Sequence, residues 1–161
     1  TVNSGNARVS GCEFNARHSL RPLGEWGRFI TVFANATKLK LEGSSTASFS
    51  SFVPETANWG LQVAWRRLTF SPRWNYRGLN KLTPQPAAGP DGYLYIRSRV
   101  MVDVSVAYQL SPRFTLVGAI GNAFNDELTQ LIYGSATPGY ARRTLNSEYG
   151  SAISLGLKGR F

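Results

Sequence analysis

The residues that could carry catalysis or hold a metal ion are few and scattered in this sequence. Its 161 residues include one histidine, His18, one cysteine, Cys12, and nine carboxylates. A lone cysteine cannot form an intrachain disulfide, and one histidine beside it cannot complete a zinc cluster. The GxSxG, Walker-type and HExxH patterns do not occur. The sequence therefore predicts a protein that is not an enzyme and that uses no metal and no cofactor.

The elements that must position the remaining polar residues are β-strands, because apolar residues recur at every second position. Valines and other apolar residues alternate with small or polar ones through 100–110, and a similar alternation runs through 149–161. Aromatic residues join the apolar face in the middle of the chain. The predicted strands, about seven and antiparallel, cover 11–20, 28–41, 58–65, 68–77, 100–110, 114–121 and 149–161.

Two local features leave the pairing of these strands open. Within 28–41, either Ile30 and its alternate residues or Phe29, Thr31 and Phe33 could point outward. Pro72 lies inside a predicted strand, where it removes a hydrogen-bond donor from the ladder. The pairing of 68–77 is therefore less defined than its alternation.

The predicted strands are about ten residues long, whereas strands of soluble sheets have about five or six. Strands of about ten residues can cross a bilayer when tilted. Short turns at 21–27, 66–67 and 111–113 alternate with long segments at about 43–56, 79–97 and 127–147. This asymmetry is typical of outer-membrane barrels, whose short turns face the periplasm. We predict an all-β fold, a transmembrane antiparallel β-barrel, with a soluble β-sandwich as the alternative.

The number of strands predicts that the barrel continues beyond this chain. Bacterial barrels have even strand numbers and both termini in the periplasm. Seven strands that end in the periplasm must begin outside, and the segment 1–7 is too short and polar to be an eighth. An open sheet would expose unpaired edges to lipid, at several kcal/mol per unsatisfied group. We expect residues 1–161 to be the C-terminal portion of a barrel domain.

Several motifs, in their order along the chain, resemble those of one family. Asn122-Ala123-Phe124-Asn125, at the outer end of the penultimate strand, is similar to the Asn-Leu-Phe-Asn signature of TonB-dependent outer-membrane receptors. The last strand ends similarly to the family's C-terminal assembly signal, with Leu155, Leu157 and Phe161 as its apolar residues. The segment 8–14 resembles the family's Gly-x-Glu strand, and 53–60, 75–78 and 102–105 are further matches.

The resemblance implies a barrel of about 22 strands, of which this chain is about the last third. The plug domain, the TonB box and the earlier strands would lie outside the chain. The implied function is active uptake of a scarce nutrient, such as a siderophore, cobalamin, a saccharide or a peptide, across the outer membrane of a Gram-negative bacterium. The implied partners are the rest of the barrel and the plug, TonB, the barrel-assembly machinery and lipopolysaccharide.

Such receptors typically hold their ligand with the plug and the extracellular loops. The expected loop contacts are Tyr93, Tyr95, Tyr133, Tyr140 and Arg142. The alternatives for function are a small passive barrel of the porin or adhesin type and a soluble β-sandwich binding module.

Charged residues fall into inward-facing and rim groups in this interpretation. The inward group is Glu13, Arg17, Arg73 and Asp103, and we expect its two carboxylates to pair with neighbouring inward arginines. The formal net charge of +9 follows the strand period and forms no single patch, so we expect no nucleic-acid partner. Basic residues near the long segments are expected to contact lipopolysaccharide phosphates or an anionic ligand: Lys38, Lys40, Lys81, Arg97, Arg99, Arg142 and Arg143.

Overall fold

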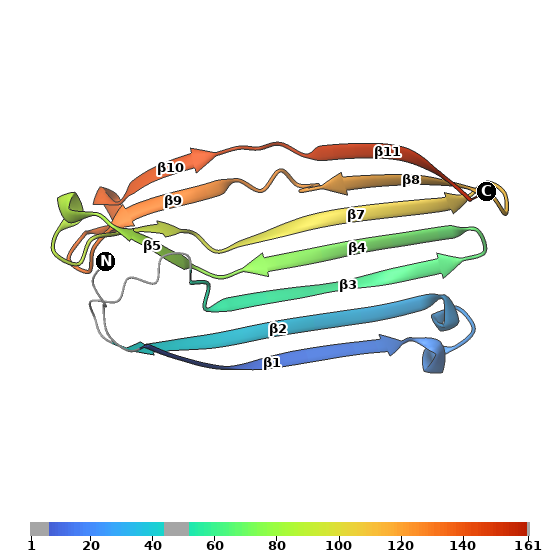
Figure 1. The fold of residues 1–161 in the computed structure, drawn as a ribbon, viewed down its shortest axis with the longest axis horizontal. Helices are drawn as coiled ribbons and strands as arrows, with labels where there is room; N and C mark the ends of the chain where they lie inside the picture. Colours follow the sequence, from blue (N-terminus) through green and yellow to red (C-terminus); the bar gives the residue numbers. More distant parts are fainter. Residues whose placement is uncertain (1–6, 44–51, 161) are drawn as a thin grey trace.

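The computed structural model describes residues 7–43 and 52–160, and it confirms the prediction of an all-β fold with antiparallel sheets. The main sheet is an extended layer (Figure 1) with the strand order β1-β2-β3-β4-β7-β8-β11. Its strands are β1 (Ala7–Ser19), β2 (Ile30–Gly43), β3 (Glu55–Trp65), β4 (Leu68–Arg77), β7 (Arg99–Gln109), β8 (Phe114–Gly121) and β11 (Ala152–Gly159). Among the described residues β1 and β11 are its two edges, and they do not pair with each other.

A second, four-stranded sheet lies at one end of the main sheet. The alternation of apolar residues does not predict this sheet. Its order is β10-β9-β6-β5, from β5 (Asn80–Pro84), β6 (Tyr93–Ile96), β9 (Leu128–Tyr133) and β10 (Arg143–Ser147). The interpretation of 79–97 and 127–147 as plain loops was wrong. The central pairing, β6 with β9, joins two segments far apart in the sequence, so alternation within either segment alone does not reveal it.

Short 3-10 helices complete the described secondary structure. The helices η1 (Arg21–Leu23) and η2 (Gly27–Phe29) form the turn between β1 and β2. The helices η3 (Pro86–Ala88) and η4 (Gly139–Ala141) lie in the connections of the second sheet. Over the described residues, no helix has the length and apolar character needed to cross a membrane.

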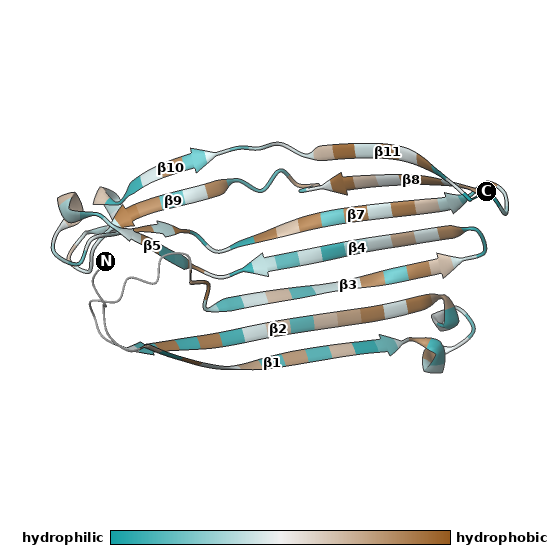
Figure 2. Ribbon diagram, viewed as in Figure 1, coloured by the Kyte–Doolittle hydropathy of each residue, from teal (hydrophilic) through white to brown (hydrophobic). Residues whose placement is uncertain are grey.

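The register of the main sheet gives it one apolar and one polar face. Directly opposite residues share a face, and Ile30 lies opposite Val63, which lies opposite Phe70. The same row continues through Val106 and Gly118 to Leu155. The register thus places Ile30 and its alternate residues on the apolar face, which decides the orientation that the sequence left open. Figure 2 shows the resulting bands of apolar residues across neighbouring strands.

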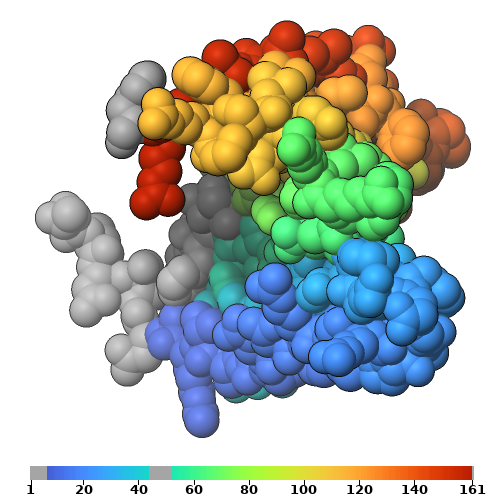
Figure 3. Space-filling model, turned by 90° about the vertical axis from the view of Figure 1, so that its right-hand side faces the viewer, coloured from blue at the N-terminus to red at the C-terminus, as the bar shows by residue number. Residues whose placement is uncertain are grey.

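Within residues 7–43 and 52–160, no protein core covers the apolar face. Val102, at 6% exposed, is the buried hydrophobic residue of the described part of the chain. Large side chains of the apolar face stay open, including Trp65 at 48%, Tyr108 at 43% and Ile153 at 78%. Figure 3, which looks at the molecule from the side of the short turns, shows the sheet as a curved wall. The hollows of the main sheet are lined largely by polar-face residues.

Two details of the predicted strands are refined. The ladder between β3 and β4 is interrupted at Ser71 and Pro72, as expected where proline removes a donor. Strand β11 begins at Ala152, so Tyr149 precedes it. The predicted assembly residues Leu155 and Leu157 lie on β11 and are 79% and 60% exposed, while Phe161 lies outside the described residues.

Candidate functional site

The second sheet brings together most of the predicted loop contacts. Tyr93 on β6 lies opposite Tyr133 on β9. The rings of Tyr95 and Tyr133 stack with centroids 4.5 Å apart and planes inclined by 20°, and Tyr93 meets Tyr95 edge to face at 6.5 Å. We call Tyr93, Tyr95 and Tyr133 the tyrosine cluster. Tyr140 lies in η4, 93% exposed, and makes no described ring contact with the cluster.

Two cations lie on ring faces of the tyrosine cluster. The Lys81 ammonium lies 3.4 Å from the centroid of the Tyr93 ring, and the Arg142 guanidinium lies 4.3 Å from that of Tyr133. Neither cation belongs to an ion pair of the described residues. Burial, with a further contribution from Tyr133, raises the pKa of Tyr95, so its hydroxyl stays a neutral donor. The aromatic rings can stack on a planar ligand group, and the N–H donors of the two cations can bind an anionic one.

Asp91 ties together the two connections near the cluster. Its Oδ2 accepts a hydrogen bond from the backbone N–H of Ser135 at 2.8 Å. Hydrogen bonding from Ser135 lowers the pKa of Asp91, because these bonds favour the ionised carboxylate. The next turn is closed by the Gly134 N–H, which donates to the Thr137 hydroxyl at 3.0 Å.

The segment 122–125, which resembles the family signature, connects the end of β8 to the residues that lead into β9 and β11 through hydrogen bonds. Asn122 has a positive φ of 50°, and its Oδ1 accepts the Asp126 N–H at 2.8 Å. Its Nδ2 donates to the carbonyl oxygens of Asp126 and Gly150, at 3.1 and 3.2 Å. The Ser151 hydroxyl donates to the Asn122 carbonyl at 2.7 Å. One side chain therefore shapes the turn after β8 and holds the segment that leads into β11.

The predicted ion pair of Asp103 is wrong. Asp103 Oδ2 accepts the Asn75 amide at 2.7 Å, and Oδ1 accepts the Asn122 N–H at 3.0 Å. Both oxygens are thus satisfied by neutral donors. Arg73 lies directly opposite Asp103, yet its guanidinium packs over the Phe33 ring, 5.5 Å from the centroid.

The register places all four predicted inward residues on the polar face. Glu13 lies opposite Thr37 and Arg17 opposite Phe33, on the edge strand β1 and its neighbour. Glu13 forms no ion pair within the described part of the chain, so the second predicted pair is wrong as well. On this exposed edge, water can solvate the carboxylate in place of an arginine.

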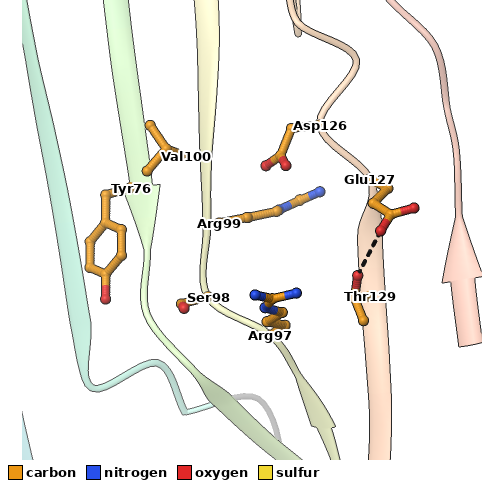
Figure 4. Close-up of a pocket in the computed structure, with 8 residues that line it drawn as sticks. All are labelled: Tyr76, Arg97, Ser98, Arg99, Val100, Asp126, Glu127 and Thr129. Carbon is orange, nitrogen blue, oxygen red and sulfur yellow. Dashed lines mark hydrogen bonds between the residues drawn. The ribbon is translucent and has the colours of Figure 1, made fainter. Parts of the chain in front are cut away.

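A mixed-charge cavity of about 380 Å³ lies between the start of β7 and the residues that lead into β9. Figure 4 shows Arg99 reaching from the start of β7 toward Glu127, with Asp126 beside it. The Thr129 hydroxyl donates to Glu127 at 3.4 Å, whereas Arg99 Nε and Asp126 Oδ2 are buried and have no hydrogen-bond partner among the described residues. Opposite charges balance in this cavity, and a bridging water would satisfy both unpaired atoms.

Two predicted rim cations already have acidic neighbours. Lys38 pairs with Glu55 at 2.9 Å, and Lys40 pairs with Glu42. These pairs offset the positive charge that would attract lipopolysaccharide phosphates. Cys12, opposite Lys38, is a free and exposed thiol on the apolar-face side of β1.

No protein-family model, curated protein or solved structure matches this chain. Within the described residues, no three His, Cys, Asp or Glu side chains are grouped to hold a metal ion.

Proposed function

We propose that this chain forms part of the wall and the external loops of a TonB-dependent receptor in the bacterial outer membrane. The observation that carries the membrane assignment is the apolar face of the main sheet, which spans its strands without a protein layer over it. Exposed apolar patches larger than a few hundred Å² are rare on soluble monomers. A hydrocarbon environment would cover this face at no cost.

The height of the apolar face supports the same proposal. On β4 it runs from Leu68 to Tyr76, and on β7 from Val100 to Tyr108. At about 3.4 Å per residue each stretch covers about 27 Å. A strand tilt of about 40° reduces this to about 21 Å, near the apolar band of about 25 Å of outer-membrane barrels. Each stretch has an aromatic residue at one end, Tyr76 on β4 and Tyr108 on β7, as suits a lipid interface.

The upper limit of the band is visible on β2. The apolar residues Ile30 to Ala36 are followed on the same face by Lys38, which pairs with Glu55. The tyrosine cluster lies in the second sheet, which is built from the long connections. In the proposed receptor the cluster and its two cations contact the ligand outside the membrane. The complete barrel and its coupling to TonB rest on the motif resemblance.

A pair of adjacent cysteine probes tests the wall. In a Cys12→Ser background, Val106→Cys and Ser105→Cys would each carry a fluorescent label in the full-length protein in lipid vesicles. We expect a lipid-soluble nitroxide to quench the label at 106 and an aqueous quencher to quench the label at 105. A soluble β-sandwich would instead shield position 106 from both quenchers, which would contradict the proposal.

The receptor function needs its own experiment. Cells that carry the full-length gene product should take up the cognate nutrient only when TonB is present. Uptake that is unchanged by deletion of TonB would favour a passive barrel. The quenching result would remain valid in that case. The membrane-wall assignment and the receptor function can therefore be refuted independently.

A further inference from the structure

The polar face of the main sheet carries a row of asparagines that alternation along one strand does not reveal. Asn15 lies opposite Asn35, Asn35 opposite Asn58, and Asn58 opposite Asn75, so one carboxamide comes from each of four adjacent strands. The Asn58 amide donates to Asn35 Oδ1 at 2.9 Å. We call these four residues the asparagine row.

Three residues of the asparagine row, Asn15, Asn35 and Asn58, line a hollow of about 610 Å³, and two arginines line it as well. Arg17 on β1 and Arg73 on β4 belong to the next row, which runs from Arg17 through Phe33 and Gly60 to Arg73. Three strand spacings of about 4.8 Å separate their backbones by about 14 Å. Both arginine side chains line the same hollow, so one small ligand can contact both.

Arg73 is held in an orientation that leans toward Arg17. Gly60 leaves no side chain between them, and the Phe33 ring occupies that space, since a Cβ on Gly60 would lie 2.7 Å from Phe33 Cζ. The Arg73 guanidinium packs over this ring at 5.5 Å. Stacking uses the face of the guanidinium and leaves its in-plane N–H donors free.

Within the described residues, no ion pair neutralises either guanidinium charge. The ion pairs of the described residues join other side chains, and Asp103, opposite Arg73, is occupied by Asn75 and the Asn122 N–H. Guanidinium groups bind carboxylate and phosphate through paired hydrogen bonds. Carboxamides both donate and accept, as hydroxyl groups require.

We propose that this hollow binds a small oxyanion that also bears hydroxyl groups. The carboxylate or phosphate lies between Arg17 and Arg73, and the hydroxyls contact the carboxamides of Asn15, Asn35 and Asn58. Charge complementarity selects this occupant over a neutral one. The proposal does not depend on the identity of the transported nutrient or on TonB.

Calorimetric titration of the full-length protein in detergent tests the proposal with glucuronate, glucose 6-phosphate and neutral glucose as probes. We expect at least one acid to bind at least tenfold more tightly than glucose. This ratio corresponds to about the free energy of one hydrogen bond to a charged group. The preferred acid distinguishes a carboxylate site from a phosphate site. Failure of both acids to bind at millimolar concentration, as when an acidic protein segment already fills the hollow, would overturn the proposal.

Matched variants locate the binding. Arg73→Gln should weaken binding of the preferred acid about tenfold or more, and Arg73→Lys should weaken it less, because the charge remains while the fork is lost. Arg113→Gln, which removes an equal charge from a short turn, should leave binding unchanged. Asn58→Leu should reduce the preference for glucuronate over acetate, which has no hydroxyls. Heat-modifiable gel migration shows whether both variants are folded. If both are folded, equal affinity of Arg73→Gln and Arg113→Gln for the preferred acid would also overturn the proposal.

Discussion

Substitution of Gly60 by alanine tests whether the close packing of β2, β3 and β4 is as tight as the structure indicates. A Cβ at this position would lie 2.5 Å from the Pro72 carbonyl oxygen and 2.7 Å from Phe33 Cζ. The carbonyl belongs to the neighbouring strand and cannot move without moving the ladder. The ring can move, but it then leaves the Arg73 guanidinium.

The size of the effect follows from these two contacts. Overpacking a tight site costs about 1–3 kcal/mol. Loss of an exposed cation–π contact adds about 0.5–1 kcal/mol. The expected destabilisation is therefore about 1.5–4 kcal/mol, which corresponds to a fall in Tm of about 3–16 °C for a chain of about 150–250 residues and to a smaller fall for a longer full-length protein.

Thermal unfolding of the full-length protein in detergent, followed by heat-modifiable gel migration, measures this change. Gly118→Ala is the matched control, because a Cβ there would meet its nearest neighbours at 3.8 Å, an ordinary contact. A Phe33→Leu background should recover part of the loss, while the part due to the Pro72 carbonyl should remain. Equal midpoints for Gly60→Ala and Gly118→Ala would refute the packing argument.

Three further predictions concern the second sheet and its junction. Asn122→Ala should destabilise the protein by about 1–3 kcal/mol, because backbone groups lose their partners and alanine disfavours the positive φ; an unfolding midpoint equal to that of wild type would contradict this. Asp91 has a lowered pKa, so its contribution is present above the ordinary carboxyl pKa and is lost as pH falls through the folded-state value. Protection of the Ser135 amide from hydrogen exchange, relative to an unstructured amide at the same pH, should therefore fall at acid pH, and it should be lost at all pH values in Asp91→Ala. Arg142→Gln should weaken binding of an anionic nutrient more than Tyr140→Phe does, since Arg142 contacts the tyrosine cluster and Tyr140 makes no described ring contact with it; equal effects on uptake would argue against the cluster as the contact.

The four-stranded sheet shows where sequence reasoning reached its limit. The sequence predicts loop contacts at Tyr93, Tyr95 and Tyr133. These residues lie in one cluster because β6 pairs with β9. These strands have four and six residues, too few for alternation to stand out from a loop. Cross-strand partners far apart in sequence leave no periodic signal in either segment.

Asp103 shows the same limit for polar contacts. Its place on the polar face could be predicted from alternation, and Arg73 is indeed its cross-strand neighbour. Its actual partners, Asn75 and the Asn122 N–H, come from a diagonal position and from a turn. Such donors are defined by register and backbone direction, which composition and charge do not encode.

The sequence by itself determined the period of two, the division of the long strands into an apolar and a polar side, and the positions of the short turns. These are local properties, because successive side chains of a strand point to opposite faces whatever the neighbouring strand is. The tertiary structure alone decided the height of each residue relative to other strands. That height orients 30–43, aligns the asparagine row beside Arg17 and Arg73, and builds the tyrosine cluster. Register arises from pairing between distant segments, so no single strand contains it.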